Sequence, residues 1–420
     1  MNNLLLKRRN KIFQELDDNS VAVLHSGFAQ FRTADETFEF VVNNNFYYLA
    51  GIDQEDSIIM IGKSHGEYFE KLFISEPTEY HEKWLGHQLT KEEASKLAEI
   101  DIKDVLFIEN FQKYFEGLLQ TARYTMVKID KVYLDLENVD LPLFNSFALN
   151  FSKQIRKGFP AVQIRDIYDN VIEQRMVKAP EEIELMKQSI ETTNHAILEV
   201  MKHHKELENE SYAEAYYNFI NTKEQKPLSF TSIIAGGVNA TTLHYHGNNS
   251  PLKGNELLLL DVGCYTNHYA SDITRTFPIS GKFSDRQKQV YEIVLDCNKK
   301  CIEYAKAGLS WKELNEYANN ILAEGLIKLG LIQDKSELSK YYFHSIGHSV
   351  GLDVHDPTIR SQGLKEGMVI TIEPGLYIKE WEIGIRIEDN ILITCEKAIV
   401  LSKNIIKEVD EIEAFLEKNK

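Results

Sequence analysis

Two acidic residues lie inside strand-forming sequence in the stretch 256–277, ELLLLDVGCYTNHYASDITRTF. The apolar run 257–262 predicts one β-strand and the run 270–277 a second, and the polar residues between them predict the turn of a β-hairpin. Asp261 lies in the first strand and Asp272 in the second. A carboxylate buried in a sheet costs free energy unless a counter-charge compensates it. The fold must therefore bring a positively charged group to these two acids.

The register of this hairpin follows from the position of its turn. A turn centred on Thr266 and Asn267 pairs Asp261 directly with Asp272. Facing residues of an antiparallel pair have Cβ atoms about 4.5–5.5 Å apart, and like charges at that distance repel each other. We therefore expect a positively charged group between the two side chains.

A second hairpin of the same kind is predicted in the stretch 368–394, MVITIEPGLYIKEWEIGIRIEDNILIT, with its polar turn at 379–382. Its register pairs Glu373 with Glu388. A slip of one residue would turn every side chain to the opposite face, so two independent hairpins that each pair two acids are stronger support than one. The alternative, that these acids lie on a solvated outer face, conflicts with the apolar flanks LLLLD and VITIE.

A fifth candidate ligand lies in the stretch 344–356, HSIGHSVGLDVHD, where His348 lies among glycines that permit close approach. Four carboxylates and one imidazole, without a thiol, favour Mn²⁺, Co²⁺ or Fe²⁺ over structural Zn²⁺. About five protein ligands suit two ions roughly 3.5–4 Å apart better than one ion. A hydroxide that bridges two such ions is a strong nucleophile at neutral pH, so the pattern predicts hydrolysis without a serine or cysteine nucleophile.

These residues and their contexts carry a family resemblance. The contexts LDVG, SDITRT, SIGHSVGLDVHD, TIEPG and RIEDN resemble those of the pita-bread metallopeptidases, which include Xaa-Pro aminopeptidase, prolidase and methionine aminopeptidase; they contain, in order, Asp261, Asp272, His348, Glu373 and Glu388. All five metal-ligand positions of that family carry the expected residue type, unlike those of its metal-free relatives. The resemblance implies two divalent ions, with Mn²⁺ as the first expectation and Co²⁺, Fe²⁺ or Zn²⁺ as alternatives, and a peptide substrate that contains proline.

The resemblance also implies roles in binding and proton transfer for a set of residues near these motifs. His244 and His355 match histidines that bind the substrate and stabilise the tetrahedral intermediate, His344 matches a histidine near the S1′ pocket, and Glu373 matches the carboxylate that takes the proton of the attacking water. Asp353 and Asp356, which flank His355, are candidates to orient that histidine.

Arg386 and Trp84 are two further candidates. Arg386 lies two residues before Glu388, hence on the same strand face, where its guanidinium is expected to hold a carboxylate by a bidentate pair. Within EKWLGHQ, Trp84 resembles the tryptophan at the lip of the substrate cleft in the aminopeptidase P branch, where it would form an S1′ wall. The alternative for Trp84 is an ordinary packing or interface residue.

The chain divides into two predicted domains, which together give an α/β two-domain fold. Residues 1–175 alternate strand-like and helix-like runs, which predicts an α/β sandwich, and they resemble the N-terminal domain of creatinase and aminopeptidase P, with roles in oligomerisation and at the cleft lip. Pro180 followed by two glutamates predicts the first helix of the second domain, 176–420. That domain repeats helices followed by an acidic hairpin, which suggests the duplicated α+β pita-bread fold.

Composition excludes several partners. The 420 residues contain 47 Lys and Arg against 64 Asp and Glu, a formal net charge of −17, which disfavours nucleic acid or an anionic membrane as the main partner. The four cysteines, the absence of a secretory apolar region and the absence of an apolar run of membrane length predict buried free thiols and a cytoplasmic location. Similar proteins form dimers or tetramers, so a homodimer or homotetramer is expected.

The sequence is therefore interpreted as a Xaa-Pro aminopeptidase that releases the N-terminal residue from peptides with proline in second position. The alternatives are prolidase, which cleaves only Xaa-Pro dipeptides and must recognise their free carboxylate, and a non-catalytic binding protein of the same fold. The proline preference comes from the resemblance alone. It is physically reasonable because the bond before proline lacks the N–H that strand-reading proteases use.

Overall fold

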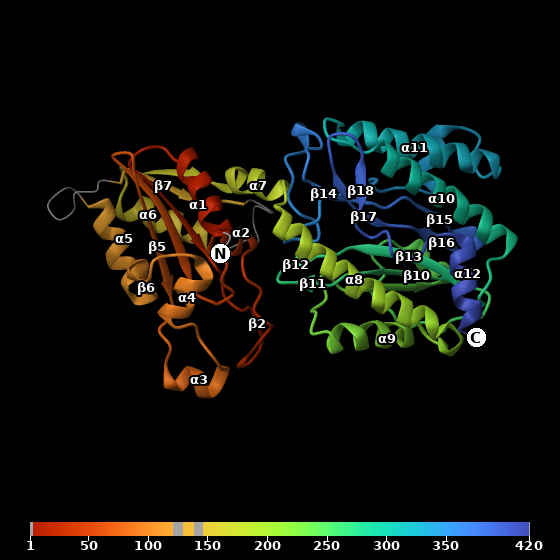
Figure 1. The fold of residues 1–420 in the computed structure, drawn as a ribbon, viewed down its shortest axis with the longest axis horizontal. Helices are drawn as coiled ribbons and strands as arrows, with labels where there is room; N and C mark the ends of the chain where they lie inside the picture. Colours follow the sequence, from red (N-terminus) through yellow and green to blue (C-terminus); the bar gives the residue numbers. More distant parts are fainter. Residues whose placement is uncertain (1–2, 121–128, 138–145, 420) are drawn as a thin grey trace. The chain divides into compact units, whose positions relative to one another are not determined.

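The computed structural model describes residues 3–120, 129–137 and 146–419. The chain forms two compact units, Met1–Arg175 and Met176–Lys420. Among the described residues, no helix is both long and apolar enough to span a lipid bilayer. Each unit is described separately below (Figure 1).

The first unit is built on a six-stranded mixed sheet in the order β6-β5-β4-β1-β7-β8. Its strands are β1 (Ser20–His25), β4 (Ile58–Ser64), β5 (Glu67–Ile74), β6 (Val105–Phe107), β7 (Lys131–Leu134) and β8 (Gln163–Asp166). The three central neighbours β5, β4 and β1 are antiparallel, whereas β6, β7 and β8 join in parallel. A short hairpin of β2 (Phe31–Thr33) and β3 (Glu36–Thr37) lies outside this sheet.

Helices cover both faces of this sheet, as the alternating pattern of the sequence predicts. The helices of the first unit are α1 (Leu4–Glu15), α2 (Asn44–Ala50), α3 (Glu79–Leu85), α4 (Lys91–Ala98), α5 (Phe111–Leu119), α6 (Phe147–Gly158) and α7 (Tyr168–Met176). Phe115 of α5 and Ile155 of α6 pack with Val21 and Val23 of β1 in one buried cluster, whereas α1 and α2 contact β4. The first unit is therefore an α/β sandwich.

The first long helix of the second unit begins at Pro180, as the sequence predicts. The helices are α8 (Pro180–Lys202), α9 (Glu210–Lys223), α10 (Asp285–Tyr304), α11 (Trp311–Lys328) and α12 (Val409–Lys418). Pro180 occupies the first turn of α8, where its missing N–H leaves no helical bond unmade. Capping boxes open α10 at Ser284 and α11 at Ser310: each serine hydroxyl accepts from the N–H of the third helical residue, and each serine N–H donates to the side chain of that residue.

The strands of the second unit lie between two pairs of helices, α8 and α9 on one side and α10 and α11 on the other (Figure 1). They are β9 (Ile233–Gly236), β10 (Leu257–Val262), β11 (Tyr265–Thr266), β12 (Tyr269–Ala270), β13 (Ile273–Pro278), β14 (Val369–Ile372), β15 (Gly375–Ile378), β16 (Ile383–Arg386), β17 (Asp389–Ile393) and β18 (Ala398–Val400). Each helix pair is followed along the chain by one acidic hairpin. This is the pita-bread arrangement that the sequence suggests.

The register predicted for the first hairpin is wrong. Asp261 pairs with Thr274 rather than with Asp272, because the two turn residues are Asn267 and His268. Both have a positive φ, 46° and 67°, as a two-residue hairpin turn with the right-handed twist of its strands requires. The shift moves the partner by two residues, and side chains alternate with a period of two. Asp261 and Asp272 therefore still point to the same face, as diagonal neighbours.

The register predicted for the second hairpin is confirmed. Ile372 pairs with Asp389 in the ladder of β14 and β17, and Gly375 pairs with Arg386 in the ladder of β15 and β16. Glu373 and Glu388 lie opposite each other where one ladder ends and the next begins.

The cysteines follow the prediction with one exception. Cys264, Cys297 and Cys301 are buried free thiols. Cys395 is also a free thiol, but it is exposed, and its predicted burial is wrong. Strand β17 ends at Ile393, so Cys395 lies in the turn that follows and not in the sheet.

Candidate metal centre

The two hairpins bring four carboxylates to one cavity of about 340 Å³ in the second unit. Asp261 belongs to β10, Asp272 directly precedes β13, and Glu373 and Glu388 lie at the breaks between the ladders of the second hairpin. Asp272 and Glu388 are only 4% and 2% exposed. The acids therefore face the cavity, as predicted, and not the solvated outer surface.

His348 completes this group from an irregular segment. Its Nε2 lies 3.3 Å from Oδ2 of Asp272 and 3.5 Å from Oε1 of Glu373. Its Nδ1 donates a hydrogen bond to the carbonyl oxygen of Ser349 at 3.0 Å, so Nε2 is the ring nitrogen that faces the carboxylates. Close approach depends on Gly347, where an added Cβ would lie 2.1 Å from the carbonyl oxygen of Thr371.

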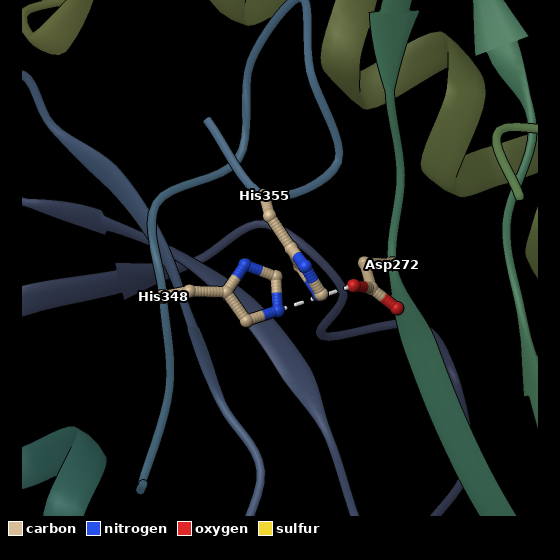
Figure 2. A group of neighbouring side chains, drawn as sticks. All are labelled: Asp272, His348 and His355. Atoms are coloured by element: carbon tan, nitrogen blue, oxygen red, sulfur yellow. Dashed lines mark ion pairs between the residues drawn. The ribbon is translucent and has the colours of Figure 1, made fainter. Parts of the chain in front are cut away.

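The geometry of the donors suits metal ions. Three overlapping groups each offer ligand atoms within 4.8 Å of one another, and together they contain Asp261, Asp272, His348, His355, Glu373 and Glu388. Figure 2 shows one of these groups, in which the rings of His348 and His355 approach the carboxylate of Asp272. All five predicted ligands are therefore brought together, and His355 joins one group as a sixth candidate.

The electrostatics of this donor cluster fit bound cations. Burial and the charge of Asp261 raise the pKa of Asp272 to about 6, and burial raises the pKa of Glu373 to about 7. Burial and the charges of Asp272 and Glu373 raise the pKa of Glu388 well above its ordinary value. Burial opposes protonation of His348, but Asp272 and Glu373 raise its pKa to about 9. Divalent cations would offset this repulsion and replace the protons, so the donor set fits them.

Arg386 supplies the positive group that the first hairpin requires. Its Nη2 donates to Oδ2 of Asp261 at 2.6 Å, with both side chains nearly buried. The predicted bidentate pair is not formed, because Nη1 donates to the hydroxyl of Tyr377 at 2.9 Å and Nε to that of Thr274 at 3.1 Å. The hydroxyl of Thr274 donates in turn to Glu388 at 2.7 Å. Arg386 thus fixes one acid directly and a second through Thr274.

Comparison with known proteins identifies the family. The model of metallopeptidase family M24 matches residues 184–395, and that of the aminopeptidase P N-terminal domain matches residues 5–127. The chain belongs to metallopeptidase family M24. A Xaa-Pro aminopeptidase from Haemophilus influenzae is 33% identical over 98% of this chain and 96% of its own.

Solved structures of M24 proteins agree over the whole chain. A protein from Bacillus anthracis described as an aminopeptidase P matches with a TM-score of 0.96 and 41% identity, over 100% of this chain and 99% of its own. Aminopeptidase P from Escherichia coli, solved with the inhibitor Pro-Leu, matches with a TM-score of 0.90 and 28% identity, over 99% and 98% of the two chains.

The three predicted histidines of the M24 site all line the cavity. His344 donates from Nδ1 to the carbonyl oxygen of Ser345 at 2.8 Å, so its Nε2 accepts a hydrogen bond from the hydroxyl of Tyr377, also at 2.8 Å. His355 packs edge-on to His348, with ring centroids 4.2 Å apart. Burial and the charge of Arg386 lower the pKa of His344 to about 4. Burial and the charge of His348 likewise lower the pKa of His355 to about 4. Both are therefore neutral near pH 7. His244 is exposed at the cavity wall.

Tyr377, which contacts residues that line the M24 cavity, and Arg360, which lines it, were not predicted from the sequence. Tyr377 links Arg386 to His344, and its position two residues after Gly375 and four after Glu373 places it on the same strand face, so the period-two pattern could have revealed it. Arg360 lines the cavity and lies 5.5 Å from the ring centroid of Trp311. It follows an irregular loop, and no periodic signal indicates it.

Trp84 lies in the first unit and is not among the residues that line this cavity. It belongs to α3, is 72% exposed and lies beside Tyr80, with ring centroids 5.8 Å apart. Its role as an S1′ wall remains a prediction.

Proposed function

We propose that this M24 protein is a Xaa-Pro aminopeptidase that hydrolyses the bond before a proline in second position and releases the N-terminal residue. One observation carries the proposal: Asp261, Asp272, His348, Glu373 and Glu388 converge on one cavity in a chain whose Xaa-Pro aminopeptidase relatives match it over nearly their full length.

The proposed cofactor is a pair of divalent ions, with Mn²⁺ first and Co²⁺, Fe²⁺ or Zn²⁺ as alternatives. The five ligand positions named above would hold it, and a set of four carboxylates and one imidazole is typical of Mn²⁺ and similar ions. When bound, the ions supply Lewis acidity and an activated water nucleophile.

The residues around the ligands bind the peptide and move protons. Glu373 is proposed to accept the proton of the attacking water. Its Oε1 accepts a hydrogen bond from the hydroxyl of Thr371 at 3.3 Å, and its Oε2 lies 3.8 Å from Nδ1 of His344. His355 and His244 are proposed to bind the substrate and to donate N–H groups to the oxygen that becomes negative in the transition state. A neutral His355 retains one such N–H without adding a positive charge beside the metal ligands.

The experiment is hydrolysis of two peptides by metal-stripped protein reloaded with Mn²⁺ or Co²⁺. One peptide is a Xaa-Pro dipeptide and the other a Xaa-Pro-Xaa-Xaa tetrapeptide, with a tetrapeptide carrying alanine in second position as the substrate control. The Asp272→Asn variant, prepared identically, controls for contaminating peptidases. It keeps the side-chain shape but lacks a carboxylate proposed to bind the metal, so cleavage by this variant indicates a contaminant. Cleavage of the proline tetrapeptide supports the proposal. Cleavage of the dipeptide alone assigns prolidase, and cleavage of neither favours a non-catalytic binding protein.

A homodimer or homotetramer is proposed for the assembly. Several large apolar side chains of the first unit are strongly exposed, which is typical of a contact surface: Phe31, Tyr80, Trp84 and Leu85. Light scattering on the purified protein gives the molar mass of the assembly, and a monomer at micromolar concentration contradicts this part of the proposal. The cytoplasm is proposed as the location, because the thiols of Cys264, Cys297 and Cys301 are unpaired.

A further inference from the structure

The loop between His348 and His355 is folded around one buried carboxylate, that of Asp356. The N–H of Asp356 donates to the carbonyl oxygen of Ser349 at 2.9 Å, and Oδ1 of Asp356 accepts from the N–H of Asp353 at 3.2 Å. The fit is tight, since a Cβ at Gly351 would lie 2.7 Å from Oδ2 of Asp356. The position of His355 therefore depends on where this carboxylate is held.

A buried lysine from a remote part of the chain holds it. Nζ of Lys178 donates to Oδ2 of Asp356 at 2.9 Å, and both side chains are only 1% exposed. Lys178 lies in the segment that precedes α8, and the backbone of this segment is itself fixed. The N–H of Lys178 donates to the carbonyl oxygen of Gly367 at 2.9 Å, and Sδ of Met176 accepts from the N–H of Ile359 at 3.3 Å.

We propose that Lys178 is a positioning residue: through Asp356 it holds the ring of His355 beside His348 and at the cavity. This inference rests on the proposed function, because it assigns Lys178 to the histidine that binds the substrate there. The physical basis is that a buried carboxylate without its cation moves towards water or takes up a proton. Either change displaces the backbone that carries His355.

The test is a double-mutant cycle with Lys178→Met and His355→Ala, read as kcat and KM on a Xaa-Pro tetrapeptide. Loss of a residue that orients the groups around a metal centre lowers activity about 10–100-fold. Lys178→Met is expected to lower kcat by at least about tenfold, with a smaller change in KM. In the His355→Ala background, the same substitution is expected to cause less than about a twofold further loss, because its target has been removed. Independent, multiplying losses would overturn the proposal.

A purely structural role is separated by a matched control. Arg9→Met removes a buried cation of the first unit, which lies 2.6 Å from Glu70. It is expected to lower the melting temperature while the folded protein keeps its kcat. If Lys178→Met behaves in the same way, with kcat unchanged, Lys178 only stabilises the fold and the proposal is wrong.

Asp356→Asn provides a second variant if Lys178→Met does not fold, because it keeps the shape and the acceptor for the N–H of Asp353. Ring ¹⁵N spectra of histidine-labelled, Zn²⁺-loaded protein then give a readout other than activity, with His355 assigned from its alanine variant. The His355 resonances are expected to shift or broaden in either variant, whereas those of His195, on the exposed face of α8, do not move. Unchanged His355 resonances contradict the positioning role. If the wild-type protein cleaves no Xaa-Pro peptide, the proposed function fails, and the spectra alone decide this inference.

Discussion

Glu210→Gln is expected to destabilise the second unit strongly, although it changes a single oxygen to an amide nitrogen. Glu210 lies in the first turn of α9 and is fully buried. Its Oε1 accepts from the N–H of Gly236 and the amide of Asn239, both at 2.9 Å. Its Oε2 accepts from the hydroxyl of Tyr245 at 2.8 Å and the N–H of Ser250 at 2.9 Å. All four donors belong to the segment that carries His244.

The magnitude follows from counting these bonds. Glutamine keeps one acceptor oxygen, so two of the four donors would face an NH₂ group that cannot accept. A hydrogen bond to a charged group contributes about 1.5–3 kcal/mol, so the expected loss is about 3–6 kcal/mol. In a domain of this size, 1 kcal/mol corresponds to about 2–4 °C, which gives a fall in melting temperature on the order of 10 °C. The loss of activity should follow, because His244 is next to Tyr245 in the chain.

Thermal unfolding followed by circular dichroism measures this effect. The control is Glu214→Gln on the same helix, where Oε1 accepts from the amide of Asn248 at 3.1 Å and the side chain is half-buried. Its melting temperature should fall by no more than a few degrees, as expected for one hydrogen bond. Equal shifts for the two variants would refute the reasoning, because burial and the four donors would then have no measurable effect.

Three further predictions concern the metal centre. Asp272→Asn or Glu388→Gln should abolish metal-dependent turnover while the circular dichroism spectrum stays that of the folded protein; full activity in either variant would contradict the metal assignment. Metal-stripped protein should lose stability as the pH rises from about 4 to 7. Folding raises the pKa of Asp272 from 3.8 to about 6 and that of Glu373 from 4.5 to about 7, so the folded state binds more protons in this window. Melting curves with and without EDTA across this range test it, and the metal-loaded protein should lack this loss. Tyr377→Phe should lower kcat by about tenfold or more, because it removes both the hydrogen bond to His344 and the acceptor for Nη1 of Arg386. The melting temperature should fall by several degrees, and an unchanged kcat would remove Tyr377 from the mechanism.

Alternation of side chains made much of the centre predictable. Apolar strand-like runs on either side of a polar turn predicted both hairpins, and the second register was correct because its turn was identified correctly. In the first hairpin the turn was placed one residue too early, at Thr266 and Asn267 instead of Asn267 and His268. A positive φ is uncommon in any non-glycine residue, even though asparagine and histidine are enriched there, so no strong local signal marked the correct turn. Asp261 and Asp272 were still assigned to one face, because moving the turn by one residue shifts each strand partner by two residues.

Contacts between remote segments could not be predicted in this way. Lys178 and Asp356 are 178 residues apart, and neither lies in a periodic element. Arg360 reaches the cavity from an irregular segment, and Glu210 reads in the sequence as an ordinary acid in the first turn of a helix. These residues were found only once the fold brought them beside their partners, since local patterns carry no information on such pairings.

Two adjacent acids of the second hairpin show why the structure is needed to separate a functional carboxylate from a structural one. Asp389 lies 2.8 Å from a guanidinium nitrogen of Arg275 and 2.6 Å from Nζ of Lys407. Although burial alone would raise the pKa of Asp389, these two cations hold it below its ordinary value. Burial raises the pKa of Glu388, and so do the charges of the neighbouring carboxylates Asp272 and Glu373. Asp389 is therefore compensated by cations of the protein itself, whereas the raised pKa of Glu388 supports the metal-ligand role proposed for it.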